Sequence, residues 1–107
     1  MKLPRIVKQF IKASNVKHYE KYIDCFTRNA VIDDIKHVVR NKISDENSDS
    51  QDDLDYQLEP IAIVETNNQI FLKVKVVNTF ESRSLHLVLK MYLSSGLTEK
   101  LKIEIVE

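Results

Sequence analysis

The feature that most constrains the fold of this chain is a change of period within residues 15–34. Apolar and aromatic side chains first recur there at helical spacing, and the pattern then changes to alternation. The helical positions are Tyr19, Tyr22, Ile23 and Phe26. Residues 27–29 break the helical period, with Asn29 suited to a turn, and residues 30–34 alternate as a strand does. The sequence therefore predicts a short helix that enters a strand through a turn, and this connection fixes how the two elements pack.

A first helix is predicted before this stretch. Its apolar stripe consists of Leu3, Ile6, Val7, Phe10 and Ile11. Pro4 lies near the first turn, where proline is tolerated, and the helix is expected to end near Asn15. After the strand, which should run to about Ile35, residues 36–40 predict a short hairpin arm.

Four further strands are predicted in the second half of the chain. The first changes its parity at Pro60, from Leu58 before it to Ile61 after it, which predicts a bulge where a long strand bends. Residues 66–68 predict a turn. The inward positions of the next two strands are Ile70, Leu72, Val74, Val76, Leu85, Leu87, Leu89, Met91 and Leu93, and Leu101, Ile103 and Ile105 close the sheet. This alternation predicts an α+β fold in which a bent antiparallel sheet wraps its apolar face around two N-terminal helices.

Motifs of a known family occur at matching spacing along nearly the whole chain. They are Asn15, Cys25-Phe26, Ala30-Val31-Ile32-Asp33-Asp34, Asn78-Thr79-Phe80, residues 85–91 and, after Gly96, residues 101–105. Together they resemble the SnoaL-like branch of the nuclear transport factor 2-like superfamily. The resemblance implies a cone-shaped fold, the same arrangement that the periodicity predicts, and a single domain over residues 1–107.

The composition disfavours several classes of partner. Sixteen basic and sixteen acidic residues cancel, so no global field attracts nucleic acid or an anionic membrane. No apolar run is long enough to span a bilayer, and no signal peptide opens the sequence. The single cysteine, Cys25, cannot form an internal disulfide and is expected to be a buried apolar residue. We therefore expect a cytoplasmic protein without a nucleic-acid or membrane partner.

Residues 44–55 differ sharply from the rest of the chain, because they hold six acidic residues and no basic one. Such a stretch buries too little apolar surface to order itself, so a flexible acidic segment is expected at about 44–55. Its acids partly match the spacing of a calcium loop, but Ser50 replaces the glycine and Tyr56 replaces the bidentate glutamate of such a loop. A solvated loop is the main interpretation. The alternative is a flap over a pocket at the open end of the predicted cone.

The predicted cone leaves a pocket at the end that the helices do not close. The resemblance to ketosteroid isomerase, an enzyme of the superfamily, places a general-base aspartate at Asp34. Parity agrees, because Asp34 lies on the same side of the strand as Ile32, and desolvation in an aliphatic pocket would raise its proton affinity. Asp33 should face solvent. The residues predicted to line the pocket are Phe10, Tyr19, Tyr22, Ile32, Asp34, His37, Leu87 and Leu89.

Other parts of that enzyme's site have no counterpart in the sequence. The tyrosine donor falls at Phe10 and the second acid near Leu87, so no oxyanion donor is predicted and ketosteroid isomerase activity itself is disfavoured. His37 is either a proton carrier beside the aspartate or a surface histidine. His18 and His86 are expected to point away from the pocket, and histidines so dispersed predict no metal site. No cofactor is predicted.

Three functions therefore stay open. The first is a SnoaL-like domain that binds a small apolar ligand in the cone pocket and forms a homodimer. The second is an isomerase- or cyclase-like enzyme with Asp34 as general acid/base, and the third is a protein-interaction module. The homodimer is implied by the resemblance and suits the outer sheet face, with scattered surface apolar residues on a monomer as the alternative. The apolar residues that interleave with lysines there are Phe71, Val77, Val88 and Tyr92.

Overall fold

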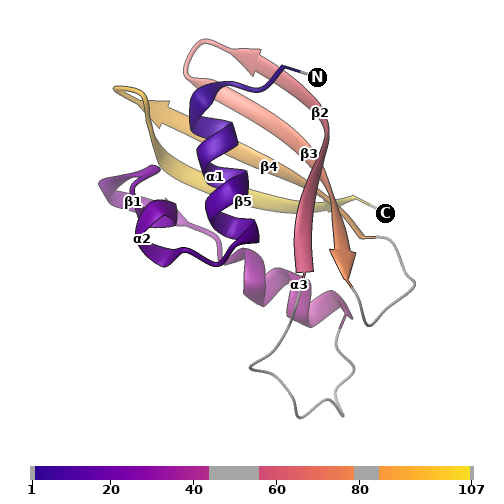
Figure 1. Cartoon of the computed structure of the whole chain (residues 1–107). Helices are drawn as coiled ribbons and strands as arrows, with labels where there is room; N and C mark the ends of the chain where they lie inside the picture. Colours follow the sequence, from indigo (N-terminus) through magenta and orange to yellow (C-terminus); the bar gives the residue numbers. More distant parts are fainter. Residues whose placement is uncertain (1, 44–55, 79–84, 107) are drawn as a thin grey trace.

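The computed structural model of the chain describes residues 2–43, 56–78 and 85–106 (Figure 1). The acidic segment predicted at about 44–55 lies outside the described residues, as do Thr79 and Phe80. The helices are α1 (Arg5–Asn15), α2 (Tyr19–Ile23) and α3 (Ile35–Ile43). The strands are β1 (Phe26–Ile32), β2 (Tyr56–Thr66), β3 (Gln69–Asn78), β4 (Leu85–Ser94) and β5 (Leu97–Val106). No helix in this described part is long and apolar enough to cross a membrane.

The strands form one five-stranded sheet in the order β1-β5-β4-β3-β2. The strands from β2 to β5 pair antiparallel with their sequence neighbours, as predicted. β1 instead pairs in parallel with β5, so the sheet is mixed and the prediction of a purely antiparallel sheet is wrong for this pair. The chain between β1 and β2 includes a helix and is long enough to reach the opposite edge of the sheet. After three reversals the last strand then returns beside β1 in the same direction.

Register shifts interrupt the sheet in three places, one of them between Phe26 and Val31 of β1, and tight turns join β2 to β3 and β4 to β5. A register shift directly after Pro60 confirms the bulge predicted in β2, and another shift lies next to Tyr92 in β4. In the predicted turn between β2 and β3, Asn68 has a φ of 64°. Between β4 and β5, Ser95 and Gly96 have φ values of 52° and 85°. Two consecutive left-handed residues are typical of the two-residue hairpin turns that match the twist of a sheet.

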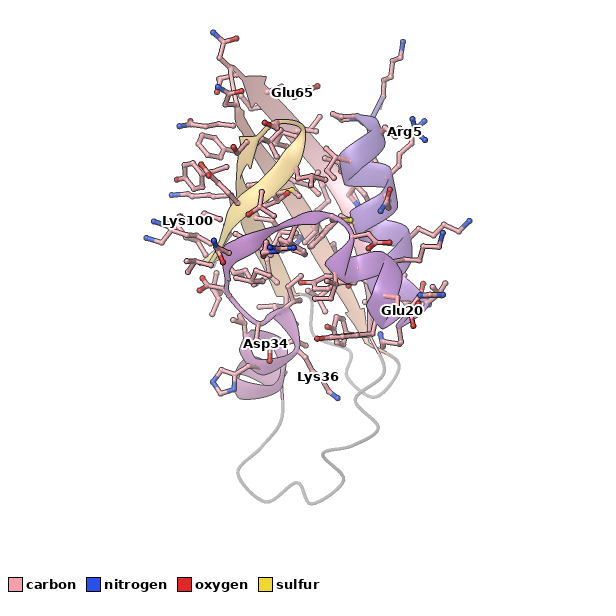
Figure 2. All side chains as sticks on the ribbon, turned by 90° about the vertical axis from the view of Figure 1, so that its left-hand side faces the viewer. Arg5, Glu20, Asp34, Lys36, Glu65 and Lys100 are labelled. Atoms are coloured by element: carbon pink, nitrogen blue, oxygen red, sulfur yellow. The ribbon has the colours of Figure 1, made fainter. Side chains whose placement is uncertain are left out.

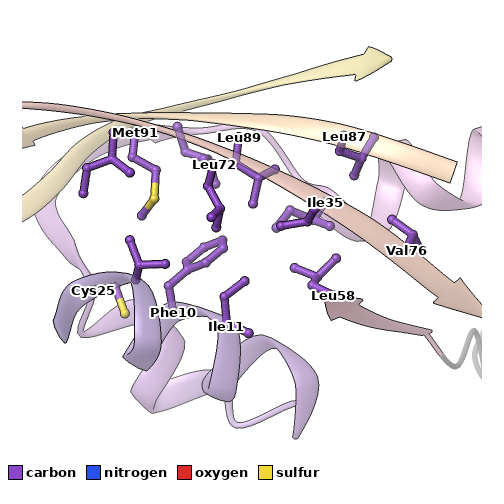
Figure 3. Close-up of a cluster of buried hydrophobic side chains, with 14 of the residues drawn as sticks. Phe10, Ile11, Cys25, Ile35, Leu58, Leu72, Val76, Leu87, Leu89 and Met91 are labelled. Atoms are coloured by element: carbon purple, nitrogen blue, oxygen red, sulfur yellow. The ribbon is translucent and has the colours of Figure 1, made fainter. Parts of the chain in front are cut away.

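The core lies between α1 and the concave face of the sheet (Figures 1 and 3). From α1, Val7 and Phe10 are completely buried. The completely buried apolar side chains of the sheet are Leu72, Val74, Leu87, Leu89, Met91 and Leu101. These are inward positions predicted from the alternation. Together with the helices packed on this face of the sheet, they confirm the predicted α+β class. Burial decreases toward the end of β5, where Ile105 is exposed.

The stretch that changes period differs from the prediction in its boundaries. α2 ends at Ile23 and β1 already begins at Phe26, so residues 27–29 belong to a strand and not to a turn. Tyr19 is 74% exposed, and the predicted apolar helix face is only partly buried. Pairing with β5 explains the early strand, because Thr98 N–H donates to Cys25 C=O at 2.9 Å. This tertiary contact outweighs the helical period of the sequence.

Residues 36–40, which were predicted to form a hairpin arm, belong to α3. Asp34 caps this helix, since its Oδ1 accepts hydrogen bonds from two backbone N–H groups of the first turn at 3.0 and 3.4 Å. Ile35 and Val39, four residues apart, are both buried and face the core. An aspartate followed by apolar residues at helical spacing is a helix-start signal, and here it describes the segment better than a hairpin does.

Candidate functional site

A hollow with a volume of about 320 Å³ opens where α1 ends and α3 begins. It lies at the open end of the cone, where Figure 2 shows Asp34 and Lys36 close together. Residues from all three helices and from the start of β2 line it. The side chains that carry chemistry in its wall are Lys17, His18, Tyr22, Asp34, Lys36 and Tyr56. The first two enter from the link between α1 and α2, and Tyr56 is the first residue of β2.

Three aromatic rings fill the cone beneath this hollow. The ring centroids of Phe10 and Tyr22 are 5.3 Å apart, those of Tyr22 and Phe26 are 5.2 Å apart, and those of Phe10 and Phe26 are 6.2 Å apart. These tilted and edge-on contacts stabilise the cluster. Only Tyr22 of the three lines the hollow, while Phe10 is completely buried. The hollow is therefore shallow and has an aromatic floor.

Two of the three tyrosines in the wall, Tyr22 and Tyr56, are at least partly buried, whereas Tyr19 is exposed. Burial raises the pKa of Tyr56 to about 12, with a further contribution from the charge of Asp34. Burial also raises the pKa of Tyr22 well above its ordinary value, with smaller contributions from Tyr56 and Asp34. Both hydroxyls consequently stay protonated at neutral pH and can donate hydrogen bonds. The sequence interpretation missed Tyr56, although its parity with Leu58 places it on the concave side of β2.

Lys17 fixes the position of Tyr56. Its Nζ donates a hydrogen bond to the Tyr56 carbonyl oxygen at 2.9 Å and lies 4.3 Å from the centroid of the Tyr56 ring. The backbone of Lys17 has a φ of 59°, which turns the chain sharply between α1 and α2. The cation thus contacts the ring and the backbone of the same residue, and it joins the end of α1 to the start of β2.

Asp34 lies in the wall of the hollow but is exposed. Its Oδ1 is occupied as the cap of α3, by the N–H groups of Lys36 and His37. The burial that was expected to desolvate this carboxylate is therefore not observed. Asp33, predicted to face solvent, is exposed, and its Oδ2 also accepts a hydrogen bond from Ile103 N–H at 2.9 Å. A catalytic role for Asp34 stays a prediction.

His18 lines the hollow, so the prediction that it points away is wrong. It caps α2, because its Nδ1 accepts a hydrogen bond from Lys21 N–H at 3.3 Å. A neutral imidazole that accepts at Nδ1 carries its proton on Nε2. His18 therefore offers the hollow one more polar side chain that sequence parity did not reveal. His86 lies in β4, where it pairs with Lys75 of β3.

The structure brings together only some of the residues predicted to line a pocket. Tyr19, Tyr22 and Asp34 line the hollow. The others lie elsewhere: Phe10, Leu87 and Leu89 are completely buried, Ile32 packs against the core and His37 is exposed on α3. A ligand in the hollow reaches the three completely buried side chains only if the residues above them move. Ligand binding by the predicted set stays a prediction.

Cys25 is completely buried, as predicted. Its Sγ donates to the Lys21 carbonyl oxygen at 3.6 Å, and burial raises the pKa of its thiol. A buried thiol with a raised pKa is a poor nucleophile. Among the described residues, no three or more His, Cys, Asp or Glu side chains come close enough together to hold a metal ion.

Comparison with solved structures identifies the fold, whereas comparison of the sequence alone does not. No family model matches the sequence, and no curated protein matches it significantly. Among solved structures, a proposed polyketide cyclase from Sinorhizobium meliloti is similar with a TM-score of 0.72 and 18% identity, over 95% of both chains. A proposed ketosteroid isomerase from Kribbella flavida has a TM-score of 0.69 and 11% identity, over 95% of this chain and 76% of that one.

A third similar structure is a nuclear transport factor 2-like protein of unknown function from Cytophaga hutchinsonii. Its TM-score is 0.66 at 13% identity, over 99% of this chain and 95% of that one. The chain therefore has the nuclear transport factor 2-like fold, and the resemblance predicted from the sequence is confirmed at the level of the fold. Identities this low do not transfer the activity of any of these proteins, since one fold hosts many functions.

Proposed function

We propose that this chain is a ligand-binding domain of the SnoaL-like type that holds a small, mainly apolar ligand in the hollow between α1, α3 and β2. The main support is the hollow itself, about 320 Å³ at the open end of the cone, with a mainly apolar surface that includes three tyrosines. This volume lies at the small end of the range of about 300–1000 Å³ for ligand sites. The hydroxyls of Tyr22 and Tyr56 would donate hydrogen bonds to one oxygen of the ligand.

A thermal-shift screen tests this proposal. The probes are apolar compounds that each carry one carbonyl or hydroxyl group. A compound present at ten times its Kd stabilises the folded state by about 1.4 kcal/mol. For a domain near this size, that should raise the Tm by about 6–11 °C. If no compound in such a library raises the Tm, the ligand proposal loses its support.

Two matched hydroxyl deletions locate the binding site. Tyr56→Phe removes a donor from the hollow, whereas Tyr92→Phe removes the same atom on the outer sheet face. A hydrogen bond contributes about 0.5–1.5 kcal/mol, so Tyr56→Phe should weaken binding about two- to tenfold. Tyr92→Phe should leave the Kd unchanged. Equal losses in the two variants would show that the compound binds elsewhere.

For the same domain we propose a homodimer formed through the outer faces of β3 and β4. Val88, half-buried, lies in the middle of this face and pairs with Lys73 and Glu104 in the adjacent strands. Sedimentation equilibrium tests the proposal: Val88→Glu should give a monomer, while Val31→Glu, at a 65%-exposed position on the edge strand β1, should not. A wild-type monomer at high concentration would contradict it.

A second candidate is an enzyme that uses Asp34 as general acid/base. The observation that favours it is electrostatic: the charge of Asp34 contributes to the raised pKa of both Tyr22 and Tyr56. Neutral tyrosines near a carboxylate provide the hydrogen-bond donors that the sequence interpretation found missing. The test is exchange of a bound ketone's α-protons with D₂O, followed by NMR. Asp34→Asn should abolish this exchange, and unchanged exchange in the variant excludes the role. The predicted protein-interaction role and cytoplasmic location stay predictions.

A further inference from the structure

A second concavity lies on the outer side of α1, between α1 and α2. Its volume is about 550 Å³, larger than that of the hollow. Figure 2 shows Arg5 and Glu20 on this helical side of the molecule and Lys100 on the opposite, sheet side. We call this concavity the helical groove and define it by Arg5, Lys8, Lys12, Val16 and Lys21.

The helical groove is strongly basic. Arg5, Lys8 and Lys12 follow one another at helical spacing on the exposed face of α1, and Lys21 faces them from α2. No ion pair joins any of these four side chains to a residue in the described part of the chain. Asp24 is the one acidic residue among those that line the groove. The groove therefore presents four cations against one acidic residue, and none of the four is ion-paired within the described part of the chain.

The distribution of charge along the sequence makes the groove stand out. The whole chain is neutral, with sixteen basic and sixteen acidic residues. Residues 2–24, which build α1 and α2, contain six basic and two acidic residues, a net charge of +4. Charge concentrated in a concave surface attracts an anionic partner more strongly than the same charge dispersed over a flat surface. The partner of this groove is therefore expected to be an anion with several charges.

The other residues that line the groove indicate which kind of polyanion fits it. No Phe, Tyr or Trp lines the groove, so it lacks the rings on which the bases of a single-stranded nucleic acid stack. The surface is concave, and Val16 is the one exposed large apolar side chain in its lining, too little apolar area to enter a bilayer. Val16, which is 60% exposed, instead adds apolar surface next to the cations. Such a surface suits an acidic peptide that presents an apolar side chain on the same face as its acidic side chains.

We propose that the helical groove binds an extended acidic peptide segment of a partner protein. The span from Arg5 to Lys12 is about 10 Å, at 1.5 Å per helical residue. In an extended peptide, side chains on one face recur about every 6.6 Å. Two or three acidic side chains on one face of the peptide therefore match the basic stripe, and an apolar side chain next along the same face contacts Val16, which lies beyond Lys12. The groove binds this peptide independently of any ligand in the hollow.

Fluorescence anisotropy with a labelled peptide tests the proposal. The probe is a synthetic peptide in which glutamates at alternate positions are followed on the same face by one leucine, with serine at the positions between, measured in about 50 mM NaCl. Lys8→Glu/Lys12→Glu should weaken its binding about tenfold or more, because it replaces two attractions by two repulsions. The milder Lys8→Gln/Lys12→Gln should weaken it about threefold. Both positions are exposed, so the variants should keep the wild-type circular dichroism spectrum.

The matched control is Lys100→Glu/Lys102→Glu, which changes the net charge equally at two exposed positions of β5. It should leave the Kd within about twofold, because Lys100 lies on the opposite side of the molecule (Figure 2) and salt screens exposed charges beyond roughly 10–15 Å at this ionic strength. In 1 M NaCl, wild-type binding should be lost. Three results would each overturn the proposal: no binding by the wild type, equal losses in the groove and control variants, or tighter binding of an oligothymidylate than of the peptide at the groove.

Discussion

Replacement of Asn15 by alanine is expected to lower the free energy of unfolding by about 2 kcal/mol. Asn15 is the last residue of α1, and its amide bonds to a single residue of β2. Its Oδ1 accepts from Leu58 N–H at 2.7 Å, and its Nδ2 donates to Leu58 C=O at 3.0 Å. β2 is an edge strand, so the side-chain amide takes the place that a neighbouring strand would occupy. It thereby joins α1 to the sheet and protects the edge.

The expected loss follows from the two hydrogen bonds. Each contributes about 0.5–1.5 kcal/mol net, so together they contribute about 1–3 kcal/mol. The contact is partly buried, and water therefore replaces only part of what alanine removes. A loss of about 2 kcal/mol should lower the Tm by about 8–16 °C. Urea unfolding measures the change directly, and an unchanged m-value would show that the folded state stays compact.

Two further variants test the geometry behind this number. Asn15→Asp keeps the acceptor for Leu58 N–H but replaces the donor to Leu58 C=O by an oxygen, so it should lose at least half as much stability. Asn29→Ala, an exposed position in β1, should change stability by less than about 0.5 kcal/mol. The reasoning is refuted if Asn15→Ala loses no more than Asn29→Ala does.

Three more predictions follow from the described contacts. Asp34→Ala should lower the free energy of unfolding, measured in urea, by about 1 kcal/mol, because it removes the cap of α3. Asp34→Asn keeps a capping oxygen and should retain most of that stability, so equal losses in the two variants would argue against the cap. The pKa of Tyr56 is raised to about 12 in the folded state, so its contribution to stability is present below about pH 10 and is lost between about pH 10 and 12. Unfolding measured across that range should show a smaller decline for Tyr56→Phe than for the wild type. Gly96→Ala should lower the free energy of unfolding by about 1–2 kcal/mol, because alanine is strained at a φ of 85°. Nothing lies within 4 Å of the added carbon, so no new contact offsets this strain, and an unchanged Tm would contradict the prediction.

Strict alternation is what made most of the sheet predictable. In β3 and β4 the inward positions are almost all aliphatic, and a shift of register by one residue would expose all of them. The bulge was predictable for a similar reason, since Pro60 cannot donate to a ladder and marks a change of parity. In both cases the deciding information is local. The sequence contains it without reference to the rest of the fold.

The errors fall where a distant partner decides the structure. Whether residues 27–29 form a turn or a strand depends on β5, which is joined there through Thr98 and Cys25 and lies some seventy residues later in the sequence. The parallel pairing of β1 likewise depends on the path between β1 and β2. α3 is a different case, because the cap at Asp34 was present in the sequence but was interpreted as a strand end.

The candidate site was predicted only in part, because the local sequence places some of its residues and contacts between distant segments place the others. Asp34 is implied by the resemblance to ketosteroid isomerase, and local parity agrees, but its surroundings depend on how α1 meets β2. Two contacts set that meeting: Asn15 with Leu58, and Lys17 with the carbonyl oxygen of Tyr56. Since Tyr56 enters the hollow only through this junction, a variant that loosens the junction should weaken ligand binding as well as stability. Asn15→Ala, which removes no side chain from the wall of the hollow, should therefore raise the Kd of a ligand identified by thermal shift, as isothermal titration calorimetry would show. An unchanged Kd would mean that the hollow is formed independently of the junction.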